Sequence, residues 1–215
     1  MEDLTSVEFR GRFPSSFWLQ FLEYIISNDA EEDQFWDYKA DLGIYKPKNK
    51  KGRLKETQEL LKDITAFCNA ESGLLIYGIT DKKPRKIIGV ENPEQLIQKV
   101  LDLIKRRCEK IVKVFNQVVP IQANSITKFC ILFIIPKTPD PIAIADYRTG
   151  NPTYYIREGP VSSPIQDHKG IAELFKTKSG LSKAEYPVLG IIQKLISYPA
   201  FQIPKYLVEQ YSNTN

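Results

Sequence analysis

The chain has 215 residues, of which 42% are hydrophobic and 26% are charged, as in an ordinary globular protein of about one domain. Its net charge of +4 and pI near 8.8 are only mildly basic, so the overall charge indicates no particular partner. The apolar runs are too short to span a bilayer and no signal-peptide pattern is present, so we expect a cytoplasmic protein without a membrane segment.

Three cysteines and a single histidine are scattered along the chain. No pair of them has the short spacing of a zinc ligand set, and an odd number of cysteines argues against a disulfide framework. We therefore expect no zinc and interpret the cysteines as small buried hydrophobic residues.

The N-terminal part of the chain predicts one helix and one strand. Apolar residues recur at helical spacing over residues 14–28. Residues 35–40 then alternate aromatic and charged side chains, which predicts a strand with Asp37 and Lys39 on one face. Two charges on one strand face are tolerated more readily at a functional site than in a core.

Residues 43–52 are rich in lysine and predict a loop. Six basic residues are concentrated in and just after this stretch. They are Lys46, Lys48, Lys50, Lys51, Arg53 and Lys55. Such a run is usually a solvated loop, but it could also contact a phosphate backbone.

The middle of the chain predicts a helix over 54–70 and a buried apolar strand over 74–79. A turn and a short strand over 86–90 follow, so the two strands suggest a hairpin. Asn92 precedes a proline, and this pair predicts the start of a helix that runs to about residue 110.

The remaining pattern predicts four strands, a last helix and an appendage. The strands are expected near 112–119, 128–135, 142–145 and 153–157, and the helix over 167–177. The fold class is therefore α/β (α+β), with a mixed sheet flanked by helices. We expect three parts: an N-terminal helical segment 1–30, a domain 31–178 and a C-terminal helical appendage 179–215.

Three motifs occur in order along the chain. In the first motif, Glu32 is followed by Asp-Tyr-Lys at 37–39. In the second, a predicted helix ends in Ala-Phe-Cys-Asn at 66–69 and leads through a glycine turn into an apolar strand that is followed by Asp81. An aromatic strand at 154–159 ends in Arg-Glu-Gly before a serine turn. Together these motifs resemble the Schlafen AlbA-type domain, the divergent nucleic-acid-binding domain of AlbA type.

The resemblance implies a single Schlafen-like lobe that binds nucleic acid, with structured RNA such as tRNA preferred and DNA possible. It further implies a metal-dependent endoribonuclease in which Glu32, Asp37 and Asp81 bind Mg²⁺ or Mn²⁺ and Lys39 offsets charge on the phosphate. The family usually has glutamate where this chain has Asp37, which could retune metal binding. The nucleic-acid-binding residues are then expected to be Lys46, Lys48, Lys50, Lys51, Arg53 and Arg157.

Plainer interpretations remain open for these residues. Asp37 and Lys39 could form an ion pair, Asp81 could shape its turn, Asn69 could cap a helix, and Arg157 could close a strand edge. The whole chain could also be a non-catalytic DNA- or RNA-binding module, or a regulatory protein-interaction module that works through segment 181–215. Because one lobe offers only half of a groove, we expect a homodimer with that segment at the interface.

Overall fold

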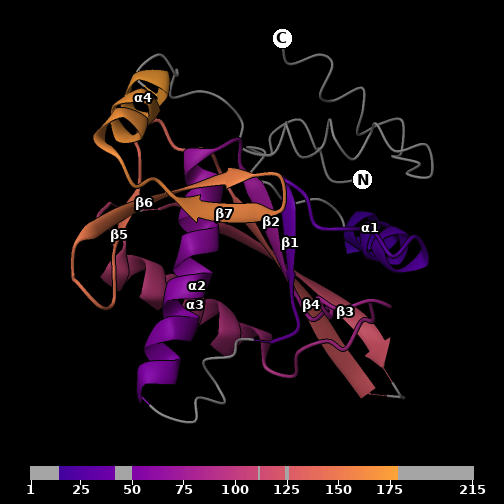
Figure 1. The fold of residues 1–215 in the computed structure, drawn as a ribbon. Helices are drawn as coiled ribbons and strands as arrows, with labels where there is room; N and C mark the ends of the chain where they lie inside the picture. The colour runs from indigo at the N-terminus through magenta and orange to yellow at the C-terminus, as the bar shows by residue number, and fades with distance from the viewer. Residues whose placement is uncertain (1–14, 42–49, 111, 124–125, 179–215) are drawn as a thin grey trace, which may run out of the picture.

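The computed structural model describes residues 15–41, 50–110, 112–123 and 126–178 (Figure 1). The elements are α1 (Ser15–Ser27), β1 (Trp36–Lys39), α2 (Lys50–Asn69), β2 (Gly73–Tyr77), α3 (Pro93–Arg107), β3 (Phe115–Ala123), β4 (Ile126–Ile135), β5 (Ala143–Ala145), β6 (Pro152–Glu158), β7 (Val161–Pro164) and α4 (His168–Lys178). None of the described helices is long and apolar enough to cross a membrane.

The strands form two sheets. The first has the order β1-β2-β4-β3, in which β1 and β2 run parallel and the other pairs are antiparallel. The second is antiparallel, with the order β5-β6-β7, and it lies against α2 (Figure 1). The predicted α+β fold, a mixed sheet flanked by helices, is confirmed.

The first sheet is covered by helices on both faces because its central strand is apolar on both sides. In β2, Leu74 and Ile76 join the core formed with α1, whereas Leu75 and Tyr77 join the core formed with α2 and α3. Successive side chains of a strand point to opposite faces, so a continuous apolar run is what a strand between two helical layers requires. Helix α1 is thus part of the same core as the sheet.

Asn69, at the end of α2, joins that helix to the second sheet. Its Nδ2 donates to the carbonyls of Ile142, at 2.9 Å, and Tyr155, at 2.8 Å, and its Oδ1 accepts from the Ile142 N–H at 2.8 Å. All three bonds are buried, so the side chain serves to dock the segment before β5 and strand β6 onto α2.

The predicted hairpin over 74–79 and 86–90 does not form as a strand pair. Ile79 and Ile87 make only an isolated bridge. The edges of β2 are occupied by β1 and β4 over Gly73–Tyr77, so the returning segment pairs only beyond the end of β2, at Ile79 and, through Val90, at Phe129 of β4. The prediction also lacked β7, which continues from β6 where a serine turn was expected.

Two helix boundaries also differ from the prediction. Helix α2 begins at Lys50, inside the predicted loop, because lysine and arginine are good helix formers and a single Gly52 does not stop the helix. Helix α3 ends at Arg107, and the Asn92 side chain makes no capping bond. Instead, the backbone carbonyl of Asn92 accepts from the Leu96 N–H at 3.2 Å.

Several predictions lie outside the described residues. These include Lys46 and Lys48, the side chains of Lys50, Lys51 and Arg53, and the whole appendage 179–215. The homodimer proposed through that appendage therefore stays a prediction, which sedimentation equilibrium of the full chain tests.

Candidate nucleic-acid site

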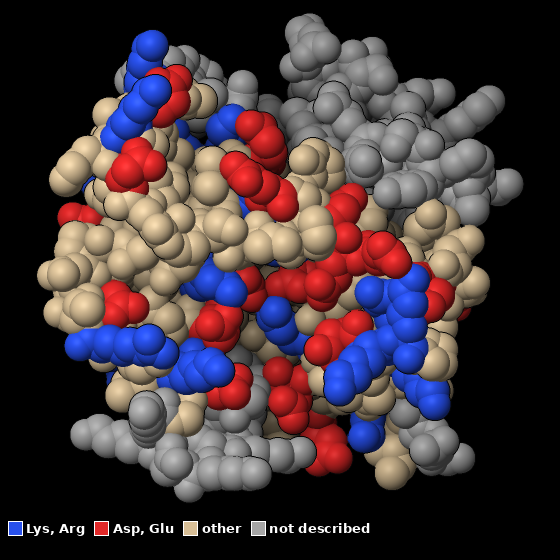
Figure 2. Space-filling model, in the orientation of Figure 1, with Lys and Arg blue, Asp and Glu red and all other residues tan. Residues whose placement is uncertain are grey.

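Acidic side chains form a band across the centre of the face shown in Figure 2, over β1 and toward α1, and Lys and Arg side chains lie on both sides of it. Strand β1 is at the centre of this region. Its register places Asp37 beside Leu75 and Lys39 beside Tyr77, so both charged side chains are on the α2 face. Trp36 lies on the opposite face, in the core with α1. The predicted charged face of this strand is confirmed.

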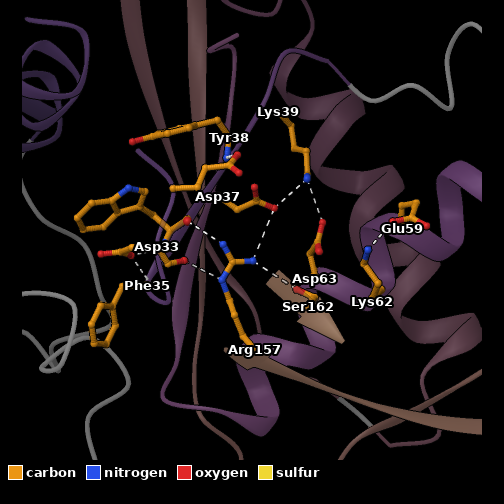
Figure 3. A network of polar contacts seen from close by, with 12 residues as sticks. Asp33, Phe35, Asp37, Tyr38, Lys39, Glu59, Lys62, Asp63, Arg157 and Ser162 are labelled. Atoms are coloured by element: carbon orange, nitrogen blue, oxygen red, sulfur yellow. Dashed lines mark hydrogen bonds and ion pairs between the residues drawn. The ribbon is translucent and has the colours of Figure 1, made fainter. Parts of the chain in front are cut away.

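Lys39 is held between two carboxylates (Figure 3). Its Nζ lies 2.8 Å from Oδ2 of Asp37 on the same strand and 3.0 Å from Oδ2 of Asp63 on α2. The two aspartate side chains are 5% and 8% exposed, whereas Lys39 is 32% exposed and reaches the surface. The interpretation of Asp37 and Lys39 as an ion pair is therefore correct, and Asp63 adds a second carboxylate.

The environment shifts the pKa of each member of this cluster. Burial raises the pKa of Asp37 and a hydrogen bond with Glu32 raises it further, while Lys39 acts in the opposite direction. Burial likewise raises the pKa of Asp63. Burial alone would lower the pKa of Lys39, but Asp63 and Asp37 more than offset this effect, so its pKa lies above the ordinary value and it remains a cation.

Glu32 contacts the strand from the loop that precedes it. Its Oε1 accepts a hydrogen bond from the Tyr38 N–H at 3.0 Å, and its carboxyl group lies close enough to that of Asp37 to raise the pKa of Asp37. The structure thus brings together two of the three predicted acids.

Arg157 lies on β6, beneath the surface. Its side chain is 1% exposed, its Nε donates to the Asp33 carbonyl at 2.9 Å and its Nη2 to the Trp36 carbonyl at 3.0 Å. The guanidinium also lies over the Phe67 ring, 4.4 Å from its centroid, and 4.0 Å from Oδ2 of Asp37. Arg157 therefore closes the edge of β1, and its expected direct contact with a phosphate does not fit this burial.

Asp81 is exposed, in the turn that follows β2. The C-terminal ends of β1 and β2 lie side by side, since the Gly78 N–H donates to the Lys39 carbonyl at 2.9 Å. The turn is also linked to the segment before Glu32 by an ion pair of 2.8 Å between Lys83 and Glu31. The three predicted acids are thus on neighbouring segments, although only Glu32 and Asp37 are shown in contact.

The predicted metal ligands do not fit a divalent cation as they are arranged. Within the described ranges, no three His, Cys, Asp or Glu side chains are grouped so that they could hold a metal ion. The Lys39 ammonium already lies between Asp37 and Asp63 at contact distance from both. Lys39 therefore already neutralises Asp37, one of the three predicted ligands, and its second carboxylate partner, Asp63, is not among them.

The comparison with protein families agrees with this architecture. The model of the family described as Schlafen, AlbA_2 matches residues 32–166, which is more than half of the chain. The chain therefore belongs to the Schlafen AlbA_2 family, and the resemblance expected from the three motifs is confirmed.

A solved structure, the DIP2311 protein from Corynebacterium diphtheriae, is 20% identical to this chain with a TM-score of 0.48. The match covers 86% of this chain but only 39% of that one, so this chain spans well under half the length of that protein. No curated protein sequence matches the chain.

Proposed function

We propose that this protein binds nucleic acid, and RNA in preference to DNA, across the face that carries β1 and α2. The observation that supports the proposal is membership of the Schlafen AlbA_2 family over the residues that build this face. The acidic band would repel phosphates, whereas the Lys and Arg side chains on either side of it would attract them (Figure 2). The backbone of the nucleic acid would therefore contact the basic flanks.

Binding should weaken steeply with salt, because each phosphate that a lysine or arginine neutralises releases counterions. The logarithm of the association constant should fall linearly with the logarithm of salt concentration, by roughly 0.7–0.9 for each phosphate contact. Mobility shifts with tRNA, single-stranded RNA and duplex DNA over a salt series measure this. Absence of binding at low salt would exclude the proposal, and equal affinity for duplex DNA would exclude the preference for RNA.

Metal-dependent cleavage of the bound RNA stays a prediction. The contact between Glu32 and Asp37 supports it, and the position of Lys39 opposes it. The test is incubation of tRNA with the purified chain and Mn²⁺, using Glu32→Gln and Asp81→Asn as variants and Asp102→Asn, an acid on α3 outside the candidate site, as the control. Cleavage that is lost in the two variants and kept in the control would support catalysis. If the parent protein does not cut RNA, the chain is a binding module.

A further inference from the structure

The turn over residues 80–86 has a well-defined backbone. The Thr80 N–H donates to the Lys86 carbonyl at 3.0 Å, and the Lys86 N–H donates back to Oγ1 of Thr80 at 2.9 Å. The hydroxyl of Thr80 also donates to the Lys82 carbonyl at 3.3 Å. These hydrogen bonds join the two ends of the turn, so its side chains are attached to a backbone of defined conformation.

Buried Arg85 anchors this turn to the loop after α1. Its side chain is only 5% exposed, and its Nη1 donates to the Asp29 carbonyl at 3.1 Å. Its backbone N–H donates to Oδ1 of Asp29 at 3.0 Å, and its guanidinium lies 4.9 Å from the centroid of the Tyr38 ring. The turn is thereby fastened to β1 and to the loop that leads to Glu32.

Among the described residues, the charges around the turn leave two lysines without a carboxylate partner. Asp29 is compensated by Arg85, and Glu31 by Lys83. Lys82 and Lys86 are exposed, and no carboxylate of the described residues pairs with either ammonium group. A turn that carries two lysines unpaired with any described carboxylate, beside an acidic band, is suited to a polyanion that runs along the edge of that band.

We propose that Lys82 and Lys86 are phosphate-contacting residues, which hold the backbone of the nucleic acid as it passes the carboxyl ends of β1 and β2. This inference rests on the proposed function and names a surface for it. Lysine ammonium groups neutralise phosphates as point charges, without reading base sequence, so the contact should be equally strong for RNAs of different sequence.

The test compares the double variant Lys82→Gln and Lys86→Gln with the parent protein, both as the full chain. Lys105→Gln with Lys169→Gln is the matched control, since it removes the same charge from exposed positions on α3 and α4. In a salt series with tRNA and with a single-stranded RNA, the turn variant should bind both RNAs several-fold more weakly at low salt. Its slope against salt should be shallower by about 1.5, because roughly 0.7–0.9 is lost for each of two phosphate contacts. The control should keep the parent slope.

The outcomes separate this inference from the proposed function. If the parent binds RNA and the turn variant has an unchanged slope, the turn is not a phosphate contact, although the proposed function stands. An equal loss in the control variant would also overturn the inference, because general charge would then explain the effect. If the parent does not bind RNA, both proposals fail. Unchanged thermal midpoints in both variants would show that the loss is one of contact.

Discussion

Replacing Arg157 with alanine is expected to destabilise the protein by about 3–5 kcal/mol, the usual cost of removing one partner of a buried charged cluster. The change would leave the carbonyls of Asp33 and Trp36 without the guanidinium that they accept from. It would also remove the positive charge next to Asp37 and the stacking over Phe67. Urea denaturation should show a lower midpoint with an unchanged slope.

Arg148→Ala is the matched control for this variant. Arg148 is an exposed arginine that contacts its neighbour Tyr147, so its removal should leave the midpoint close to that of the parent. A midpoint for Arg157→Ala that is as high as that of the control would contradict the assigned role.

Replacing Lys39 with methionine, which is similar in length, should cost about 2–4 kcal/mol at neutral pH. The buried carboxylates Asp37 and Asp63 would lose their common cation, which normally costs about 3–5 kcal/mol, and the partial exposure of Lys39 reduces that figure. Lys62→Met is the control, because Lys62 pairs with the exposed Glu59 and should contribute about 0.5 kcal/mol or less.

The cost of Lys39→Met should depend on pH. Burial raises the pKa values of Asp37 and Asp63 above those of the unfolded chain, and without Lys39 they rise further. An acid that binds its proton more tightly in the folded state stabilises that state at low pH, and this stabilisation is lost as pH rises through the folded pKa. The difference from the parent should therefore be largest at neutral pH and shrink as pH falls toward the ordinary aspartate pKa. A difference that does not change between pH 7 and pH 4.5 would contradict this electrostatic origin.

The sequence predicted the local part of the candidate site well. The alternation in residues 35–40 placed Asp37 and Lys39 on one strand face, and the structure has them there. Asp63 was missed although a signal was present. It lies three residues after Leu60 and four before Phe67 on the apolar side of its helix, where an acid needs a buried partner.

The long-range part could not be predicted. Arg157 reaches the backbone of Asp33 across 124 positions, and no local pattern indicates which carbonyl a distant arginine contacts. The predicted strand over 86–90 does not form for a similar reason, because β4, from a distant part of the sequence, occupies the edge of β2. Periodicity describes the face of an element, whereas these features depend on which elements become neighbours.

The contact between Arg157 and the loop before β1 affects the order in which parts of this protein fold during synthesis. Glu32 and Asp37 leave the ribosome long before β6. Strand β6 carries Arg157, whose guanidinium donates to the carbonyls of Asp33 and Trp36 next to these acids. Until β6 has emerged and docked on α2, a nascent chain contains Glu32, Asp37, Lys39 and Asp63 but lacks the hydrogen bonds from Arg157. The candidate site is therefore among the last parts of the fold to be completed, and products of premature termination before β6 would carry its acids in an unfinished form.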